Sequence, residues 1–125
     1  SGGAESSSVC EELAAKLGSR LPDVKDRALR SLASKVEAGL VSLDAVARLR
    51  GLPHKLLLWI NDRQGETPPE LVRMALRMIA LLAEQPSAAR GLQQAGCADF
   101  LRDFLAGSPD FRSEVQQALA VVERA

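Results

Sequence analysis

The chain repeats one apolar pattern three times, as Val24-x3-Ala28-Leu29-x2-Leu32, Val72-x2-Ala75-Leu76-x2-Ile79 and Val115-x2-Ala118-Leu119-x2-Val122. The copies lie about 43 to 47 residues apart. The stretches before the last two copies also match, because Gly51, Leu56, Trp59 and Ile60 correspond to Gly96, Leu101, Phe104 and Leu105. Helical repeats of roughly 40–47 residues are typical of armadillo and HEAT solenoids. Such units stack to bury their apolar faces and leave long surfaces for other macromolecules. The pattern therefore predicts a binding scaffold rather than an enzyme.

The composition limits the classes of partner. The 125 residues suffice for one domain with a real core. Sixteen basic residues balance sixteen acidic ones, so the chain lacks the basic excess that favours nucleic acid. With three Phe, one Trp and no Tyr, it also has little with which to stack bases. No apolar run approaches the roughly 20 residues that span a bilayer. We therefore expect neither nucleic acid nor membrane as a partner.

The residues suited to catalysis or metal binding are few. Cys10 and Cys97 are the only cysteines, and His54 is the only histidine. They form no zinc or disulfide pattern, so we expect no metal and no cofactor. We interpret His54 as a surface residue, and both cysteines as small apolar groups in helix contacts of an intracellular protein.

Start and stop signals divide the chain into eight helices and no strand. Ser8 with Glu11, and Thr67 with Glu70, have the spacing of capping boxes, and we expect Ser42 and Ser108 to cap the helices that follow them. Gly51 and Gly96 favour turns with left-handed backbone geometry. The expected helices run from Ser8 to Leu17, Pro22 to about Gly39, Ser42 to Gly51, Pro53 to Ile60, Thr67 to about Gln85, Pro86 to Gly96, Cys97 to Ala106, and Ser108 to the last residue.

The order of helix lengths predicts an all-α, armadillo/HEAT-like, right-handed solenoid. Short, middle and long helices form one triplet over residues 42–85 and a second over 86–125, after an N-terminal helix pair that forms an incomplete first unit. We interpret residues 1–8 as a flexible leader or a remnant of cloning. Residues 9–125 then form a single domain, which we expect to be the N-terminal part of a longer solenoid protein.

The long third helix of an armadillo triplet lines the concave groove. The polar residues that these helices offer beside their apolar stripes are Arg30, Arg73, Arg77 and Gln117. Such donors can hold an acidic or extended peptide. The alternative is a solvated face with i, i+4 charge pairs. The stripe with Leu76 at its centre, and Trp59 with its counterpart Phe104, are expected to be core rather than binding surface.

Further segments carry a resemblance to a known family. They are Lys16-Leu17-Gly18-Ser19-Arg20-Leu21, Arg27-Ala28-Leu29, Lys35-Val36-Glu37, Leu56-Leu57-Leu58-Trp59-Ile60-Asn61, Pro86-Ser87-Ala88-Ala89 and Ala95-Gly96-Cys97-Ala98-Asp99-Phe100-Leu101. In order and spacing they resemble the start of the rotatin family, large centriolar and basal-body proteins of ciliated eukaryotes. The similarity covers roughly residues 13 to 122. The chain departs from the family's pattern in its polar loop over residues 63–67 and in Ile60, which replaces an aromatic residue.

The resemblance implies an armadillo-like domain without catalysis that acts in centriole assembly and cilium formation. It implies a location in the cytoplasm and cytoskeleton, at the centrosome, centriole and ciliary basal body, with other centriolar proteins as partners. Self-association through an exposed end of the solenoid remains open. The alternative is a generic armadillo or HEAT adaptor that binds a linear peptide in another pathway. An enzyme with a small-molecule substrate would need clustered titratable groups, and the sequence shows none.

Overall fold

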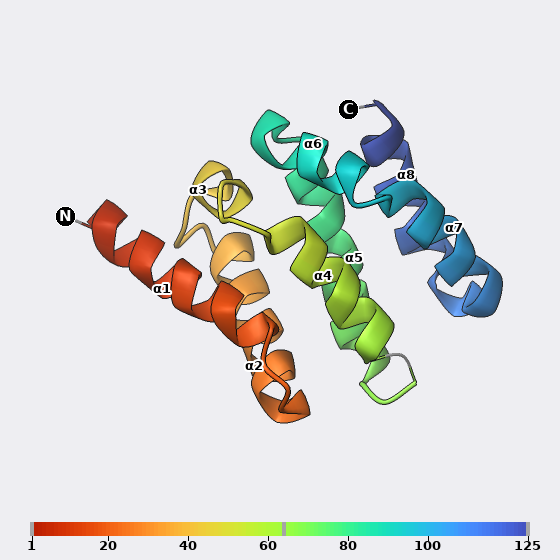
Figure 1. Ribbon diagram of the computed structural model, residues 1–125, viewed down its shortest axis with the longest axis horizontal. Coiled ribbons are helices and arrows are strands. Elements are labelled where there is room, and N and C mark those ends of the chain that lie inside the picture. Colours follow the sequence, from red (N-terminus) through yellow and green to blue (C-terminus); the bar gives the residue numbers. More distant parts are fainter. Residues whose placement is uncertain (1, 64, 125) are drawn as a thin grey trace.

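The computed structural model describes residues 2–63 and 65–124, and it describes side chains from residue 8 onward. The described residues form eight α-helices and one 3-10 turn, with no strand among them (Figure 1). The elements are α1 (Gly2–Leu17), α2 (Pro22–Glu37), α3 (Leu43–Ala47), α4 (Leu52–Asp62), α5 (Pro69–Ala83), α6 (Pro86–Gln94), α7 (Cys97–Gly107), η1 (Pro109–Phe111) and α8 (Arg112–Arg124). The all-α prediction is confirmed, while the handedness of the solenoid stays a prediction.

The helices lie in two layers. The long helices α2, α5 and α8 form one row, in which α5 contacts both neighbours, and α1, α4 and α7 lie in front of them in Figure 1. α1 packs on α2, α4 on α5 and α7 on α8, while the short helices α3 and α6 connect successive pairs. This grouping matches the predicted helix pair followed by two triplets.

The core runs through both layers, and α5 is its centre. The stripe predicted from the sequence is buried at every position: Leu71, Val72, Ala75, Leu76, Ile79 and Leu82. Neighbours on two sides explain why α5 is so apolar, since each fully buried aliphatic side chain contributes about 1.5–3 kcal/mol. Trp59 is 0% exposed and Phe104 5%, which confirms that both lie in the core.

Two local predictions at helix starts are confirmed. Gly51 and Gly96 precede α4 and α7 with φ of +72° each, in the left-handed region that favours glycine. Ser42 caps α3, because its Oγ accepts a hydrogen bond from the Ala45 N–H at 3.3 Å. The repeat therefore begins its middle helix twice with the same glycine turn.

Two predicted caps are wrong because the helices begin elsewhere. α1 already begins at Gly2, so Ser8 lies inside the helix rather than at its start. Ser108 makes no side-chain cap, and the 3-10 turn η1 leads into α8 instead. The division into a leader over residues 1–8 and a domain over 9–125 stays a prediction.

Thr67 does not cap α5 either. Pro68 is held at ψ of 139° because the residue before a proline is pushed out of the helical region, so the helix begins at Pro69. The Thr67 hydroxyl donates instead to the Arg63 carbonyl oxygen at 3.2 Å. The expected capping box is thus replaced by a bond that closes the loop between α4 and α5.

Candidate functional site: the polar face of the long helices

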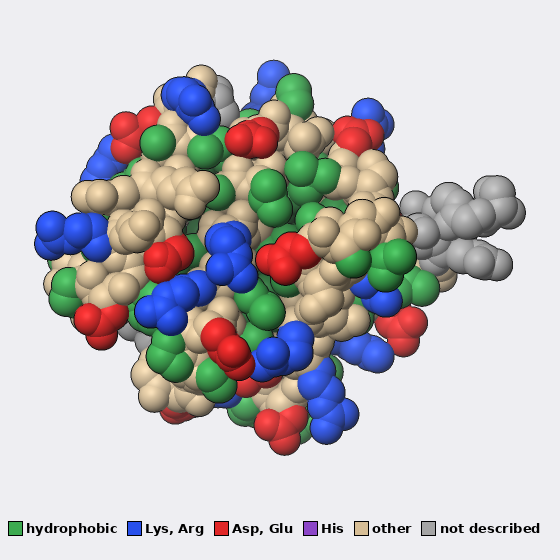
Figure 2. Space-filling view, turned by 180° about the vertical axis from the view of Figure 1, so that it is seen from behind, with side chains coloured by type: hydrophobic (Ala, Val, Ile, Leu, Met, Phe, Trp, Pro, Cys, Tyr) green, Lys and Arg blue, Asp and Glu red, His purple; other side chains and the backbone are tan. Residues whose placement is uncertain are grey.

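The candidate site is the solvent side of the row formed by α2, α5 and α8. Figure 2 views the molecule from behind, and basic and acidic side chains lie next to one another across it, with hydrophobic side chains between them. Neither charge sign dominates this view. All four residues predicted to bind a partner belong to these three helices: Arg30 to α2, Arg73 and Arg77 to α5, and Gln117 to α8.

Two of the predicted arginines connect α2 to α5. Arg30 donates from Nη2 to Glu70 Oε1 at 3.2 Å, and the Arg77 Nη2 lies 3.6 Å from Glu37 Oε1. All four side chains are 48–63% exposed. Exposed ion pairs of this kind contribute about 0–1 kcal/mol each, so their arginines can exchange partners at little cost.

The third arginine connects α5 to α8. Arg73 donates from Nε to Glu114 Oε1 at 3.3 Å. Its guanidinium carbon also lies 5.3 Å from the centroid of the Phe111 ring, close enough for a cation–π contact. Phe111 stacks in turn on Phe104, with ring centroids 5.8 Å apart. Arg73 is therefore held by two partners, and structural support is its principal visible role.

Arg77 and Gln117 come together at a small hollow where α2, α5 and α8 converge. The hollow holds about 150 Å³ and is lined by Glu37, Arg77, Ala80, Leu81, Glu84, Gln117 and Val121. Its rim offers guanidinium and amide donors beside carboxylate acceptors, the groups that hydrogen-bond an extended peptide backbone. Arg30 and Arg73 do not line this hollow, so the structure brings two of the four predicted residues together.

Neither sequence interpretation of these charges anticipated the pairing that the structure shows. The arginines do not pair along their own helices at i, i+4; they pair between neighbouring helices. The separations along the chain are 40 positions for Arg30–Glu70 and 41 for Arg73–Glu114. The predicted site is thus a set of cross-helix contacts that also faces solvent.

The sequence analysis missed a second charge cluster, between α2 and the end of α4. Arg63 is 8% exposed and donates from Nε and Nη2 to both carboxylate oxygens of Asp26, at 3.0 and 2.8 Å. A third donor, Nη1, reaches Glu66 at 2.9 Å. The Asp26 hydrogen bond is the main cause that raises the pKa of Arg63. Beside it, Lys25 donates to Asp62 at 3.3 Å. The signal that could have predicted this cluster is the order of charges, which is basic then acidic in Lys25-Asp26 and acidic then basic in Asp62-Arg63.

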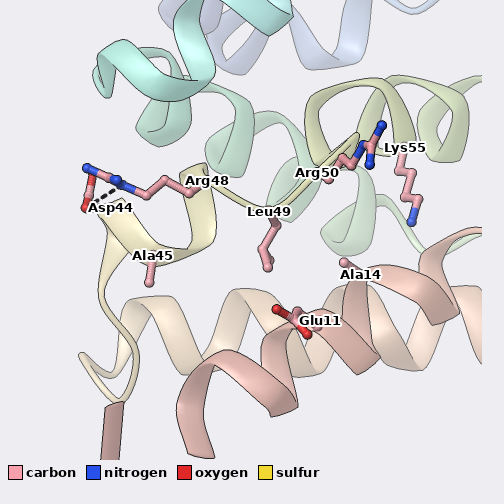
Figure 3. A pocket seen from close by; sticks show the side chains of 8 residues that line it. All are labelled: Glu11, Ala14, Asp44, Ala45, Arg48, Leu49, Arg50 and Lys55. Atoms are coloured by element: carbon pink, nitrogen blue, oxygen red, sulfur yellow. Dashed lines mark hydrogen bonds and ion pairs between the residues drawn. The ribbon is translucent and has the colours of Figure 1, made fainter. Parts of the chain in front are cut away.

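A larger hollow, also missed, lies between α1 and the segment from α3 to α4 (Figure 3). It holds about 590 Å³, and Glu11 and Ala14 line it from α1. Arg48 is bound to Asp44 at 3.0 Å on one side, while Arg50 and Lys55 lie on the other, from the loop before α4 and from α4 (Figure 3). Acidic and basic groups are mixed here, so the hollow selects no charge.

The groups suited to catalysis are dispersed. Burial raises the pKa of the Cys97 thiol to about 12, and burial also raises that of Cys10, against the opposing charge of Lys35. Both thiols therefore stay protonated and poorly nucleophilic at neutral pH. His54 is exposed at the start of α4, as predicted. Among the described residues, no group of three His, Cys, Asp or Glu side chains is placed to hold a metal ion. No helix in the described part of the chain combines the length and the apolar character needed to cross a bilayer.

Comparisons with known proteins agree with the resemblance. A family model described as "Rotatin, an armadillo repeat protein, centriole functioning" matches residues 23–122. Rotatin from Homo sapiens is 28% identical over 112 residues, which is 89% of this chain and 5% of the human protein. The chain therefore spans about a twentieth of the length of that relative. No solved structure matches the chain significantly.

Proposed function

Because the chain belongs to the family described as rotatin, an armadillo repeat protein in centriole functioning, we propose that it is a non-catalytic scaffold for protein–protein contacts in centriole and basal-body assembly and in cilium formation. The family match over residues 23–122 is the observation that carries this proposal. Under this proposal the protein acts in the cytoplasm and cytoskeleton, at the centrosome, centriole and basal body. Its partners are other centriolar proteins.

The architecture supports a scaffold. Ion pairs between helices connect α2 to α5 and α5 to α8, so the three long helices present a continuous face. Partner binding on this face uses Arg30, Arg73, Arg77 and Gln117. Arg77 and Gln117 form the centre of the contact, because they share the hollow between the helices. The weak, exposed pairing of Arg77 with Glu37 lets its guanidinium turn to a carboxylate or carbonyl of the partner.

The experiment is localisation in a ciliated cell of the tagged full-length protein and of the same protein without residues 9–125. The full-length protein is expected at centrioles, and the shortened protein is expected to lose that position. Full-length signal away from centrioles would contradict the centriolar role and leave the generic peptide adaptor. Centriolar signal from the shortened protein would mean that recruitment lies elsewhere in the protein.

A second pair of variants tests the face itself. Arg77→Ala with Gln117→Ala removes both donors of the hollow and leaves the buried core unchanged. Arg90→Ala is the matched control, since Arg90 is an exposed arginine on α6, outside the three long helices. Loss of centriolar recruitment in the double variant alone supports the assigned face. Equal recruitment of all three proteins contradicts it.

A further inference from the structure

A groove between α1 and α2 opens at one end of the helix row, where α1 and α2 lie at the edge of the fold in Figure 1. It holds about 600 Å³. Leu13 and Val24 supply apolar surface from the two helices, and Lys16, Arg27 and Arg30 supply three positive charges. Among the side chains that the structure describes, no acidic one lines the groove. An apolar floor with a basic rim is the complement of an acidic amphipathic segment.

The apolar surface continues beyond the groove. Val9 is 41% exposed and lies four positions before Leu13 on α1, while Leu21, the extended residue that precedes α2, is 63% exposed. Residues four positions apart share a face of a helix, so Val9 extends the apolar strip along α1, and Leu21 adds an exposed apolar side chain just before α2. Isolated exposed hydrophobic residues are ordinary, but a strip that continues from a groove is typical of an interaction site.

The repeat indicates what kind of element fits there. Within the chain, α5 packs against α2, the long helix that precedes it in the row. Arg77 on α5 lies 3.6 Å from the carboxylate of Glu37 on that preceding helix. Arg30 precedes Arg77 by the interval that separates Ala28 from Ala75, so it occupies the same register in α2. No helix of the described residues covers α2 on its corresponding side. At the equivalent position inside the fold, Arg77 faces a helix that carries a carboxylate, so we expect a helix of the same kind beside Arg30.

The charges of the rim are available to a partner. Arg27 is exposed and makes no ion pair within the described part of the chain. Lys16 is paired only with Glu12, on its own helix at 3.3 Å, and Arg30 only with Glu70. Both pairs are about half exposed or more, so they are weak and exchangeable.

We propose that this groove binds an acidic amphipathic helix of a partner protein. The apolar face of that helix packs on Leu13 and Val24, and its carboxylates reach Lys16, Arg27 and Arg30. This is the helix-in-groove mode of recognition. The surface lies at the end of the stack and is distinct from the hollow at Arg77 and Gln117.

The test uses two synthetic amphipathic peptides, each with one Leu stripe, flanked by Glu in the first and by Lys in the second. Titration of the isotope-labelled chain is followed by the NMR shifts of its backbone amides. The Glu peptide is expected to shift the amides of α1 and α2, and the Lys peptide is expected to leave them unchanged. Arg27→Glu should weaken binding of the Glu peptide by about tenfold, the equivalent of one favourable rim contact.

The controls separate this groove from the rest of the surface. Arg90→Glu reverses an exposed charge on α6 and should leave the affinity unchanged, while Val24→Gln should weaken binding through the apolar floor. Emission of the buried Trp59 verifies that each variant is folded. Three outcomes overturn the proposal: no shifts at α1 and α2, equal shifts with both peptides, or shifts only on the face of α5 and α8. Concentration-dependent shifts at α1 and α2 with a dimeric solution mass also overturn it, since a second copy then covers the groove.

Discussion

Removing the charge of Asp26 is expected to destabilise the fold far more than removing the charge of an exposed carboxylate that lies at nearly the same distance from its own arginine. Asp26 accepts two hydrogen bonds from Arg63, whose side chain is 9% exposed. In Asp26→Asn the guanidinium stays buried and keeps Glu66, which is itself 69% exposed, as its remaining ion-pair partner. Breaking a buried ion pair costs about 3–5 kcal/mol. Because Asp26 is 19% exposed and Glu66 remains, the expected loss is about 2–3 kcal/mol.

The assay is urea unfolding followed by the fluorescence of Trp59, the only tryptophan of the chain and fully buried in the fold. For a domain of this size, the expected loss lowers Tm by roughly 8–12 °C. The matched control is Glu123→Gln. Its carboxylate lies 2.7 Å from Arg102, yet both side chains are about half exposed, so the loss should stay below about 1 kcal/mol.

Comparing the two variants shows whether burial or the length of the ion pair determines the loss of stability. Equal losses in Asp26→Asn and Glu123→Gln would refute the reasoning, because the two ion pairs have nearly the same length. The double variant Asp26→Asn with Arg63→Met adds a further test. It removes the unpaired buried charge and should recover part of the lost stability. Failure to recover would show that an unpaired buried charge is not the cause of the loss in Asp26→Asn.

Three other measurements follow from the same structure. Gly96→Ala should lower the free energy of unfolding by about 1–2 kcal/mol, because the φ of Gly96 is +72°. Gly107→Ala is the control and should leave the free energy of unfolding unchanged, since an added Cβ also meets open space there but φ is not positive. Equal urea midpoints for the two variants would contradict the backbone explanation. Leu76→Ala should cost about 2–5 kcal/mol in the same assay, because Leu76 is 0% exposed, and a loss below 1 kcal/mol would argue against the central place of α5 in the core. Cys97 should resist a thiol reagent in the folded chain at neutral pH and react after unfolding. Its pKa is raised from 9.0 to about 12. Its contribution to stability is therefore constant below pH 9 and declines between pH 9 and 12, because the thiol of the unfolded chain ionises first. Rapid labelling of Cys97 in the native chain would refute its burial.

The apolar periodicity, together with the start and stop signals and the order of helix lengths, sufficed to predict the helices, their grouping and the core. Burial acts on every third or fourth residue, so the stripe around Leu76 is visible in one sequence without knowledge of its neighbours. The equivalent positions of Trp59 and Phe104 were visible for the same reason. Helix starts were harder to predict. Pro68 moved the start of α5 beyond the reach of Thr67, and this effect depends on the backbone angle of one residue rather than on a pattern.

The four candidate residues lie on the long helices as predicted, but their contacts were not predicted, because the ion-pair partners come from neighbouring helices of the stack. The opposite charge four residues before Arg30 is Asp26, but Asp26 pairs with Arg63, and Arg30 pairs instead with Glu70, which α5 brings within 3.2 Å. The buried pair of Arg63 and Asp26 was hidden in the same way, since its members are 37 positions apart. Periodicity states which face of a helix meets its neighbour, whereas the pairing of charges depends on the axial offset between two helices. That offset is set by packing of the apolar side chains, and no single helix encodes it.

The same offset links the two proposed surfaces. Arg77 is met by a carboxylate because α2 precedes α5 in the stack, and Arg30 stands at the equivalent register with no helix before it among the described residues. We therefore expect the end of the row to bind a helix that carries a carboxylate, as α5 meets Glu37 of α2 inside the fold. Binding at this end and binding at the Arg77 hollow involve different sides of α2. Arg30 lines the end groove and also belongs to the proposed face of the long helices, so the two proposed surfaces share this residue, whereas Arg77 and Gln117 lie outside the groove.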